Sequence, residues 1–238
     1  MSLTYDDALR QRLQHNLDRH QRTSTPLDGR RHAGVAIVVV DSESGSDHIE
    51  PAEHGVEVSA DDRRMLDSER MDGVSGGAAF LLIRRTAGRS HARQWALPGG
   101  KVDEGETVVE AAMREVHEEV GVRFSEAAVL GLLDDYPTRS GFVMTPVVIW
   151  GGGRLELDPE PGEVYATYRV GLSELKRDDS PRFIEIPESD RPVVQMPLGG
   201  ALVHAPTGAV LLQFAEVCLD GQLNKRVDHL EQPVFAWK

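Results

Sequence analysis

The fold of this chain is decided by the stretch Gly100-Lys-Val-Asp-Glu-Gly-Glu-Thr-Val-Val-Glu-Ala-Ala-Met-Arg-Glu-Val-His-Glu-Glu-Val-Gly-Val122. Its second half predicts a helix over 107–120, because apolar residues recur at helical spacing and Gly121 stands where a helix commonly ends. The apolar positions are Val108, Ala111, Ala112, Val116 and Val120. This helix is the best-defined element that the sequence predicts.

Three glutamates of the predicted helix share one face. Glu115, Glu118 and Glu119 are spaced i, i+3, i+4, so their side chains lie within a few ångströms of one another. Like charges at this spacing destabilise a helix by roughly 0.2–0.5 kcal/mol per pair. A solvated acidic face is the bland interpretation, whereas a hard divalent cation such as Mg²⁺ or Mn²⁺ would turn the repulsion into binding.

The whole stretch resembles the Nudix box, GX5EX7REUXEEXGU with U an aliphatic residue, and it matches every specified position from Gly100 to Val122. The resemblance implies an α/β protein with the Nudix fold, an α/β/α sandwich around a mixed β-sheet. We expect one domain over 1–238, with an N-terminal helix, an acidic insertion at 41–76, and a C-terminal helix and extension at 199–238.

In the Nudix family, the glutamates that match Glu115, Glu118 and Glu119 hold one or more Mg²⁺ ions, and Mn²⁺ is the alternative. The resemblance therefore implies a pyrophosphohydrolase in which metal neutralises the charge on a diphosphate and lowers the pKa of a coordinated water. The loop that precedes the helix, with Gly99 and Gly100, is expected to contact the substrate.

The sequence also suggests a role for Arg114 and candidates for the catalytic residues. Arg114 is expected to pair with Glu106 or with the acids of its own helix, and so to orient the loop rather than to bind substrate. Glu115 and Glu118 are the candidate catalytic residues within the box, and Glu163 is a candidate outside it. The sequence leaves open whether Glu118 or Glu163 acts as the general base.

The flanks of the box resemble the coenzyme A diphosphatase branch of the family. Upstream, 81–85 and 91–100 are similar to the LLTxR and HxGQxxFPGG motifs of that branch, with departures at Arg93, Trp95 and Leu97. Downstream, 133–148 carries a Ser-Gly turn before a TPVV strand. This resemblance implies coenzyme A or an acyl-CoA as the substrate, cleaved to 3′,5′-ADP and a 4′-phosphopantetheine.

Arginines near these motifs suit a phosphorylated ligand, because guanidinium binds phosphate bidentately. We expect Arg84, Arg85 and Arg139 to contact the substrate, with Arg84 and Arg85 offsetting an acidic surface as the competing interpretation. Two rival functions remain. One is a hydrolase of ADP-ribose, a nucleoside-diphosphate sugar or a dinucleotide, and the other is a non-catalytic Nudix-fold nucleotide sensor.

The composition of the chain excludes some classes of binding partner. The formal net charge of −13 argues against a nucleic-acid-binding surface, and residues 41–72 carry eleven acids against three arginines. No apolar run is long enough to cross a bilayer and the N-terminus lacks a secretory pattern, so a cytoplasmic protein is expected. The single cysteine, Cys218, excludes an internal disulfide and is interpreted as a buried thiol. The sequence leaves a homodimer open.

The remaining elements follow from periodicity and turn residues. Helices are expected within 4–21 and over 209–219, and strands over 34–40, 78–83, 128–133, 142–150 and 164–170. A loop is expected between the second strand and Pro98. The stretch 199–208 is interpreted as a Gly-rich turn, and 228–237 as a last extended segment.

Overall fold

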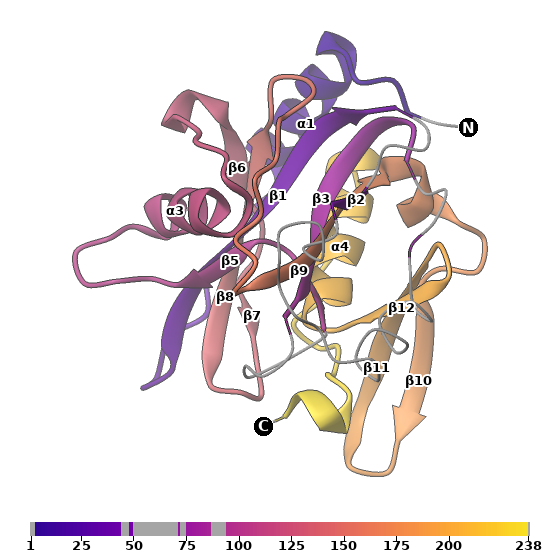
Figure 1. The fold of residues 1–238 in the computed structure, drawn as a ribbon. Helices are drawn as coiled ribbons and strands as arrows, with labels where there is room; N and C mark the ends of the chain where they lie inside the picture. Colours follow the sequence, from indigo (N-terminus) through magenta and orange to yellow (C-terminus); the bar gives the residue numbers. More distant parts are fainter. Residues whose placement is uncertain (1–2, 44–47, 50–70, 72–74, 87–93, 238) are drawn as a thin grey trace, which may run out of the picture.

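The computed structural model of the protein describes residues 3–43, 48–49, 71, 75–86 and 94–237 (Figure 1). Within these ranges the strands form a nine-stranded sheet, whose main path is β2-β9-β3-β1-β8-β6, and a three-stranded sheet in the order β10-β11-β12. The main-path strands are β1 (Arg31–Ser42), β2 (His48–Ile49), β3 (Gly77–Arg85), β6 (Val129–Leu132), β8 (Phe142–Trp150) and β9 (Val164–Gly171). Three short strands extend the sheet: β4 (Trp95–Ala96), β5 (Gly99–Lys101) and β7 (Tyr136–Pro137).

The large sheet is mixed. Strands β1 and β8 run parallel with Arg31 opposite Phe142 and Val39 opposite Trp150, whereas the other pairs are antiparallel. Eight consecutive residues of β1, 33–40, are buried, as expected for a strand covered on both faces. The apolar run at 34–40 therefore corresponds to a central strand of the sheet.

Helices cover both faces of this sheet. Helix α3 (Val108–Val120) packs on one face, where Val116 joins Val38 and Leu81 in a buried cluster. On the other face, α1 (Asp7–Arg19) and α4 (Thr207–Phe214), which is continued by a π-helical turn over Ala215–Leu219, share a larger cluster. Figure 1 shows α3 and α4 on opposite sides of the strands. The expected α/β/α sandwich with a mixed sheet is confirmed.

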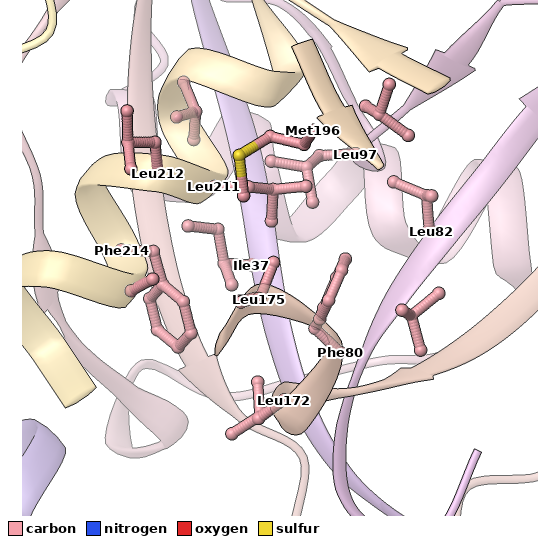
Figure 2. Close-up of a cluster of buried hydrophobic side chains, with 14 of the residues drawn as sticks. Ile37, Phe80, Leu82, Leu97, Leu172, Leu175, Met196, Leu211, Leu212 and Phe214 are labelled. Carbon is pink, nitrogen blue, oxygen red and sulfur yellow. The ribbon is translucent and has the colours of Figure 1, made fainter. Parts of the chain in front are cut away.

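The larger cluster extends beyond the main sheet. Figure 2 shows Ile37 and Phe80 of the main sheet in the same cluster as Phe214 and Met196, and Met196 comes from the three-stranded sheet. That sheet comprises β10 (Arg182–Ile186), β11 (Ser189–Leu198) and β12 (Ala201–His204). Both sheets thus contribute to one buried cluster, while the assignment of 1–238 to a single domain stays a prediction.

Helix α3 begins and ends where its local sequence directs. Thr107 is the N-cap and accepts a hydrogen bond from Glu110 N, and the Glu110 side chain accepts one from Thr107 N, which completes a capping box. At the other end Gly121 has a φ of 78°, a conformation that favours glycine. These caps define where the helix that carries the three glutamates begins and ends.

Several expectations outside the core were wrong in detail. The loop expected before Pro98 contains β4, and the expected turn at 199–208 contains β12. The last segment is not extended throughout, because a 3₁₀ helix, Val234–Ala236, forms near its end. The sequence suggested no strand at β10 or β11, where prolines and charged residues interrupt any alternation and the β10 side chains are almost all exposed.

Most of the acidic insertion at 41–76 lies outside the described residues; within it, β1 reaches Ser42, and β2 forms at His48–Ile49. Cys218 is buried, as predicted. No helix in the described ranges has the length and apolar character needed to span a membrane.

Candidate active site

The site is built where the double glycine of β5 meets helix α3. A Cβ placed on Gly100 would lie 2.2 Å from Glu115 Oε1, so the absence of a side chain lets the carboxylate pack directly against the strand. Gly99 has a φ of 157°, and a Cβ there would lie 2.5 Å from Gly34 O. Glycine is therefore required at both positions, for one contact with a carboxylate and one with a neighbouring backbone.

Glu119 is the buried centre of the site. Its residue exposure is 0%, its Oε2 accepts a 2.9 Å hydrogen bond from Gly99 N, and its Oε1 lies 3.3 Å from Arg85 NH1. Burial raises the pKa of Glu119 to about 8, since it outweighs the opposing effects of Arg85 and of the Gly99 hydrogen bond. Among the described residues Oε1 has no hydrogen-bond donor. The carboxyl group is therefore largely protonated near neutral pH, and a bound cation would favour its charged form.

Arg114 holds the acids around the helix in place. Its Nε and NH2 donate to Glu106 at 2.9 and 3.1 Å, and its NH1 donates to both Glu115 Oε1 and Glu118 Oε2 at 2.8 Å. NH2 also donates to Lys101 O at 2.9 Å. The expected pairing with Glu106 is confirmed, and one guanidinium joins the helix to the preceding loop. The guanidinium also offsets the repulsion between Glu115 and Glu118. From the sequence alone, a metal ion was the cation expected to offset this repulsion.

The glutamates differ in exposure. Burial raises the pKa of Glu115, against the lowering effect of Arg114, and its side chain is 16% exposed. The side chain of Glu118 is 53% exposed. Glu163, the residue immediately before β9, lies close enough for its charge to raise the pKa of both Glu115 and Glu119. The structure thus brings Glu163 to the helix glutamates, although it is 44 residues beyond Glu119 in the chain.

The donor set fits a hard divalent ion, although the side chains are not gathered around one point. In the part of the chain that the structure describes, no three His, Cys, Asp or Glu side chains form a group with the geometry of a metal site. Glu115 and Glu118 are held by Arg114, and Glu119 by Gly99 and Arg85. The fit rests on the buried Glu119 Oε1 and on carboxylate chemistry, which Mg²⁺ and Mn²⁺ prefer.

A cavity of about 1000 Å³ opens on the other side of the double-glycine strand. Gly99, Gly100 and Arg85 line it, and these residues contact or abut the carboxylates of Glu115 and Glu119. The opposite wall comes from the C-terminal part of the chain, including Leu202, His204, Thr207, Gln232 and Phe235. The C-terminal extension at 199–238 therefore shapes the cavity.

Two of the three expected substrate arginines line this cavity. Arg84 is 1% exposed, and its guanidinium lies over the ring of Trp95 at 4.7 Å. Trp95 in turn meets Tyr168 edge-on, with ring centroids 5.1 Å apart. Arg85 also lines the cavity and reaches Glu119. Arg84 is thus a buried cation held by an aromatic face, and Arg85 connects the cavity to the acidic helix.

Arg139 has a different environment from the one expected. Its NH2 and Nε donate to the Glu231 carboxylate at 2.5 and 3.2 Å, and its guanidinium lies 4.8 Å from the ring centroid of Trp237. It is not among the cavity-lining residues, whereas its neighbours Thr138 and Ser140 are. In this structure Arg139 fastens the C-terminal segment to the 138–141 turn.

Sequence reasoning missed other residues of the cavity. Arg31 and Lys101 line it because β1 pairs with both β5 and β8. No motif marks Arg31, which precedes the apolar run of its strand, and its place in the site depends on strand register. His204 and Phe235, which meet edge-on with centroids 5.3 Å apart, come from the C-terminal part, where no motif was recognised.

Comparisons with known proteins agree with this architecture. A model of the NUDIX domain matches residues 72–185. An uncharacterized Nudix hydrolase, NudL, of Photorhabdus laumondii is 36% identical over 109 residues, 45% of this chain and 58% of the relative. Nudix hydrolase 3 of Caenorhabditis elegans is 34% identical over 107 residues, 43% of this chain and 45% of that protein. The aligned region thus spans about half the length of these curated relatives.

A solved structure supports the fold. The MutT/nudix family protein from Enterococcus faecalis aligns with 92% of this chain and 76% of its own, with a TM-score of 0.50 and 16% sequence identity. The segment matched by the domain model contains both the glutamate helix α3 and the Gly99–Gly100 strand against which its carboxylates pack. Residues 72–185 of this chain therefore match the NUDIX domain, and the fold is similar to that of a MutT/nudix family protein.

Proposed function

We propose that this protein is a Mg²⁺- or Mn²⁺-dependent pyrophosphohydrolase that cleaves the phosphoanhydride joining a nucleoside diphosphate to another group. The observation that carries the proposal is Glu119, a fully buried carboxylate whose Oε1 lacks a hydrogen bond among the described residues and which lies beside a cation-lined cavity. Arg85 offsets only part of the cost of burying this charge, since burial still raises the pKa of Glu119 to about 8, and a bound metal ion would offset more of it.

Glu115, Glu118 and Glu119 are the residues that would hold the metal. When bound, the ion would neutralise charge on the diphosphate oxygens and lower the pKa of a water molecule. Gly99 and Gly100 line the cavity beside these carboxylates, so their backbone would lie next to the bound diphosphate. The space that a side chain would take is filled by Glu115 at Gly100 and by the backbone of Gly34 at Gly99. Arg85 adds a positive charge between Glu119 and the cavity, where a guanidinium can bind a phosphate oxygen.

Either Glu118 or Glu163 takes the proton from the attacking water. Glu118 is half exposed and lies on the helix, with Arg114 as its partner. Glu163 lies immediately before β9, and its charge raises the pKa of both Glu115 and Glu119. Substitution of each residue by Gln separates these roles, since loss of the base lowers kcat more than it raises KM.

Coenzyme A or an acyl-CoA is the proposed substrate. The resemblance of 81–100 and 133–148 to the coenzyme A diphosphatase branch supports it, as does a cavity that combines cations with apolar walls. Leu97, Met144 and Ala201 contribute apolar surface, while Arg84 lies beside the aromatic ring of Trp95. The products would be 3′,5′-ADP and (acyl-)4′-phosphopantetheine.

The test is a substrate panel of coenzyme A, ADP-ribose, NADH and a dinucleoside polyphosphate, each incubated with Mg²⁺ or Mn²⁺. Release of 3′,5′-ADP from coenzyme A faster than cleavage of the others supports the assignment. Rapid cleavage of another diphosphate with none of coenzyme A would reject coenzyme A and retain the hydrolase. Glu104→Gln serves as the control, because Glu104 is an exposed acid of the loop that precedes α3.

A nucleotide sensor of the same fold is the competing function from another class. The Glu119→Gln variant separates the two functions. A sensor would show no turnover in either form and unchanged ligand affinity, whereas a hydrolase would lose its turnover in the variant.

A further inference from the structure

The charged residues that line the cavity are all basic. They are Arg31, Arg84, Arg85 and Lys101, and no Asp or Glu lines the cavity within the described part of the chain. The protein as a whole has 39 acidic residues against 26 basic ones. A cavity with only cations in so acidic a chain concentrates positive potential and attracts anionic ligands.

Arg31 and Lys101 lie apart from Arg85, and the distance between them follows from the strand register. Arg31, Ala33 and Val35 alternate along β1 and therefore face the same side of the sheet. Gly99 lies opposite Val35, next to the acidic site, and Lys101 lies opposite Ala33. Four residues at about 3.3 Å each place Arg31 about 13 Å along β1 from the level of Gly99.

Lys101 is a diagonal neighbour of Arg31 on the same face, within reach for two long side chains. The pair is thus displaced from Arg85 and Glu119 toward the other end of the cavity. A single diphosphate held at the acidic site would not occupy both places.

Arg31 is oriented for binding. Its guanidinium lies 3.9 Å from the ring centroid of Phe142, which faces it on β8, and its backbone N donates to Gly141 O at 3.0 Å. Stacking uses the face of the guanidinium and leaves N–H groups at its edge for an acceptor. Within the described ranges neither Arg31 nor Lys101 forms a salt bridge with a carboxylate.

The turn beside Phe142 adds polar groups. Ser140 lines the cavity, and its Oγ lies 3.1 Å from Thr138 Oγ1. Thr138 Oγ1 is itself held by Phe142 N at 2.9 Å, which fixes the turn next to the stacked arginine. A hydroxyl and two cations thus line the same end of the cavity.

We infer that Arg31, Lys101 and Ser140 form a second anion-binding subsite, which selects substrates that carry a phosphate monoester on the nucleoside in addition to the diphosphate. A phosphate monoester carries close to two negative charges and several acceptor oxygens, which match a guanidinium edge, an ammonium group and a hydroxyl. The inference rests on the proposed function, because the phosphate monoester reaches the subsite of Arg31, Lys101 and Ser140 only when the diphosphate lies at the acidic site.

Isothermal titration calorimetry with AMP, adenosine 3′,5′-bisphosphate and adenosine 2′,5′-bisphosphate tests the subsite without turnover. We expect at least one bisphosphate to bind the wild-type protein tenfold or more tightly than AMP, and the better of the two identifies the position of the phosphate. The double variant Arg31→Gln/Lys101→Gln is expected to abolish that preference. Arg30→Gln, which removes a neighbouring arginine that binds the Pro26–Leu27 turn instead, is expected to keep it.

Equal binding of AMP and both bisphosphates by the wild type overturns the inference, as does a preference that survives in the double variant. If the double variant does not fold, Lys101→Gln alone is measured, because this side chain is exposed at a strand edge. Hydrolysis of coenzyme A and of its 3′-dephospho form is followed in parallel. Cleavage of both with equal KM rejects the subsite and retains the hydrolase, whereas selective binding without cleavage of any diphosphate retains the subsite and rejects the hydrolase.

Discussion

Glu119 accepts a hydrogen bond from the backbone N–H of Gly99 at 2.9 Å, and this contact joins the acidic helix to the strand that borders the cavity. The helix carries the carboxylates, and the strand separates them from the cavity that it lines. Because the carboxylate is fully buried, its geometry is determined by packing, and small changes on either side of the contact should alter activity.

Glu119→Gln keeps the size of the side chain and removes its charge. We expect kcat to fall by about 100-fold or more, since the variant loses a charged group that interacts with the bound metal in the reacting complex. Steady-state hydrolysis of the preferred diphosphate with Mg²⁺ measures the effect. Activity within twofold of the wild type, alongside an unchanged Glu104→Gln control, would show that Glu119 holds no metal.

The same residue gives the metal-free protein a dependence of stability on pH. The pKa of Glu119 rises from 4.5 to about 8 on folding, because burial disfavours the charged form. Its contribution to the free energy of unfolding is therefore fully present below about pH 4.5 and is lost as the pH rises through about 8. Urea denaturation in the presence of EDTA should show a smaller decline over this range for Glu119→Gln than for the wild type. An identical decline in both proteins would assign it to other groups.

Gly100→Ala should disable the site while leaving the fold intact. The added Cβ would meet Glu115 Oε1 at 2.2 Å, so the carboxylate must move from the strand. A displacement of about 1 Å in catalytic groups costs about 100-fold in rate. The thermal unfolding midpoint and kcat/KM are measured together, with Gly162→Ala as the control, where the nearest atom is the end of the Glu160 side chain at 3.3 Å. Full activity of Gly100→Ala would contradict the assigned geometry.

The Arg139–Glu231 ion pair predicts a loss of stability in acid. Burial raises the pKa of Glu231, but hydrogen bonds from Arg139, Gln232 N and Ser189 outweigh it and lower the pKa to about 2 from 4.5. The stabilisation is therefore present above about pH 4.5 and is lost as the pH falls through about 2. In Arg139→Gln this acid dependence should become smaller, as measured by urea denaturation between pH 2 and 6.

Arg154→Gln is the matched control for that experiment, because Arg154 forms an exposed ion pair with Glu43 at 3.0 Å and such pairs contribute little. The Arg139 variant also tests the substrate contact expected from its motif. A KM that rises at neutral pH with no loss of stability would restore Arg139 to the binding site.

Local sequence was sufficient for the helix that carries the chemistry. The spacing of Glu115, Glu118 and Glu119, the cap at Thr107 and the stop at Gly121 depend on residues within one or two turns of each other, so helical geometry and capping chemistry predicted them. The strand at 142–150 was predicted to its bounds for a similar reason, since a buried strand is a run of apolar and β-branched residues.

Only the tertiary structure decided which distant residues meet. Glu163 reaches the helix glutamates through the pairing of β9 with β3, and Arg31 reaches the cavity through the register of β1 with β8, while Arg139, which a motif favoured, pairs with Glu231 instead. Sequence alone predicted the groups that do the chemistry, because their spacing is local. The cavity that receives the substrate depends on strand register and on packing of the C-terminal segment, and both are set by contacts between residues far apart in the chain.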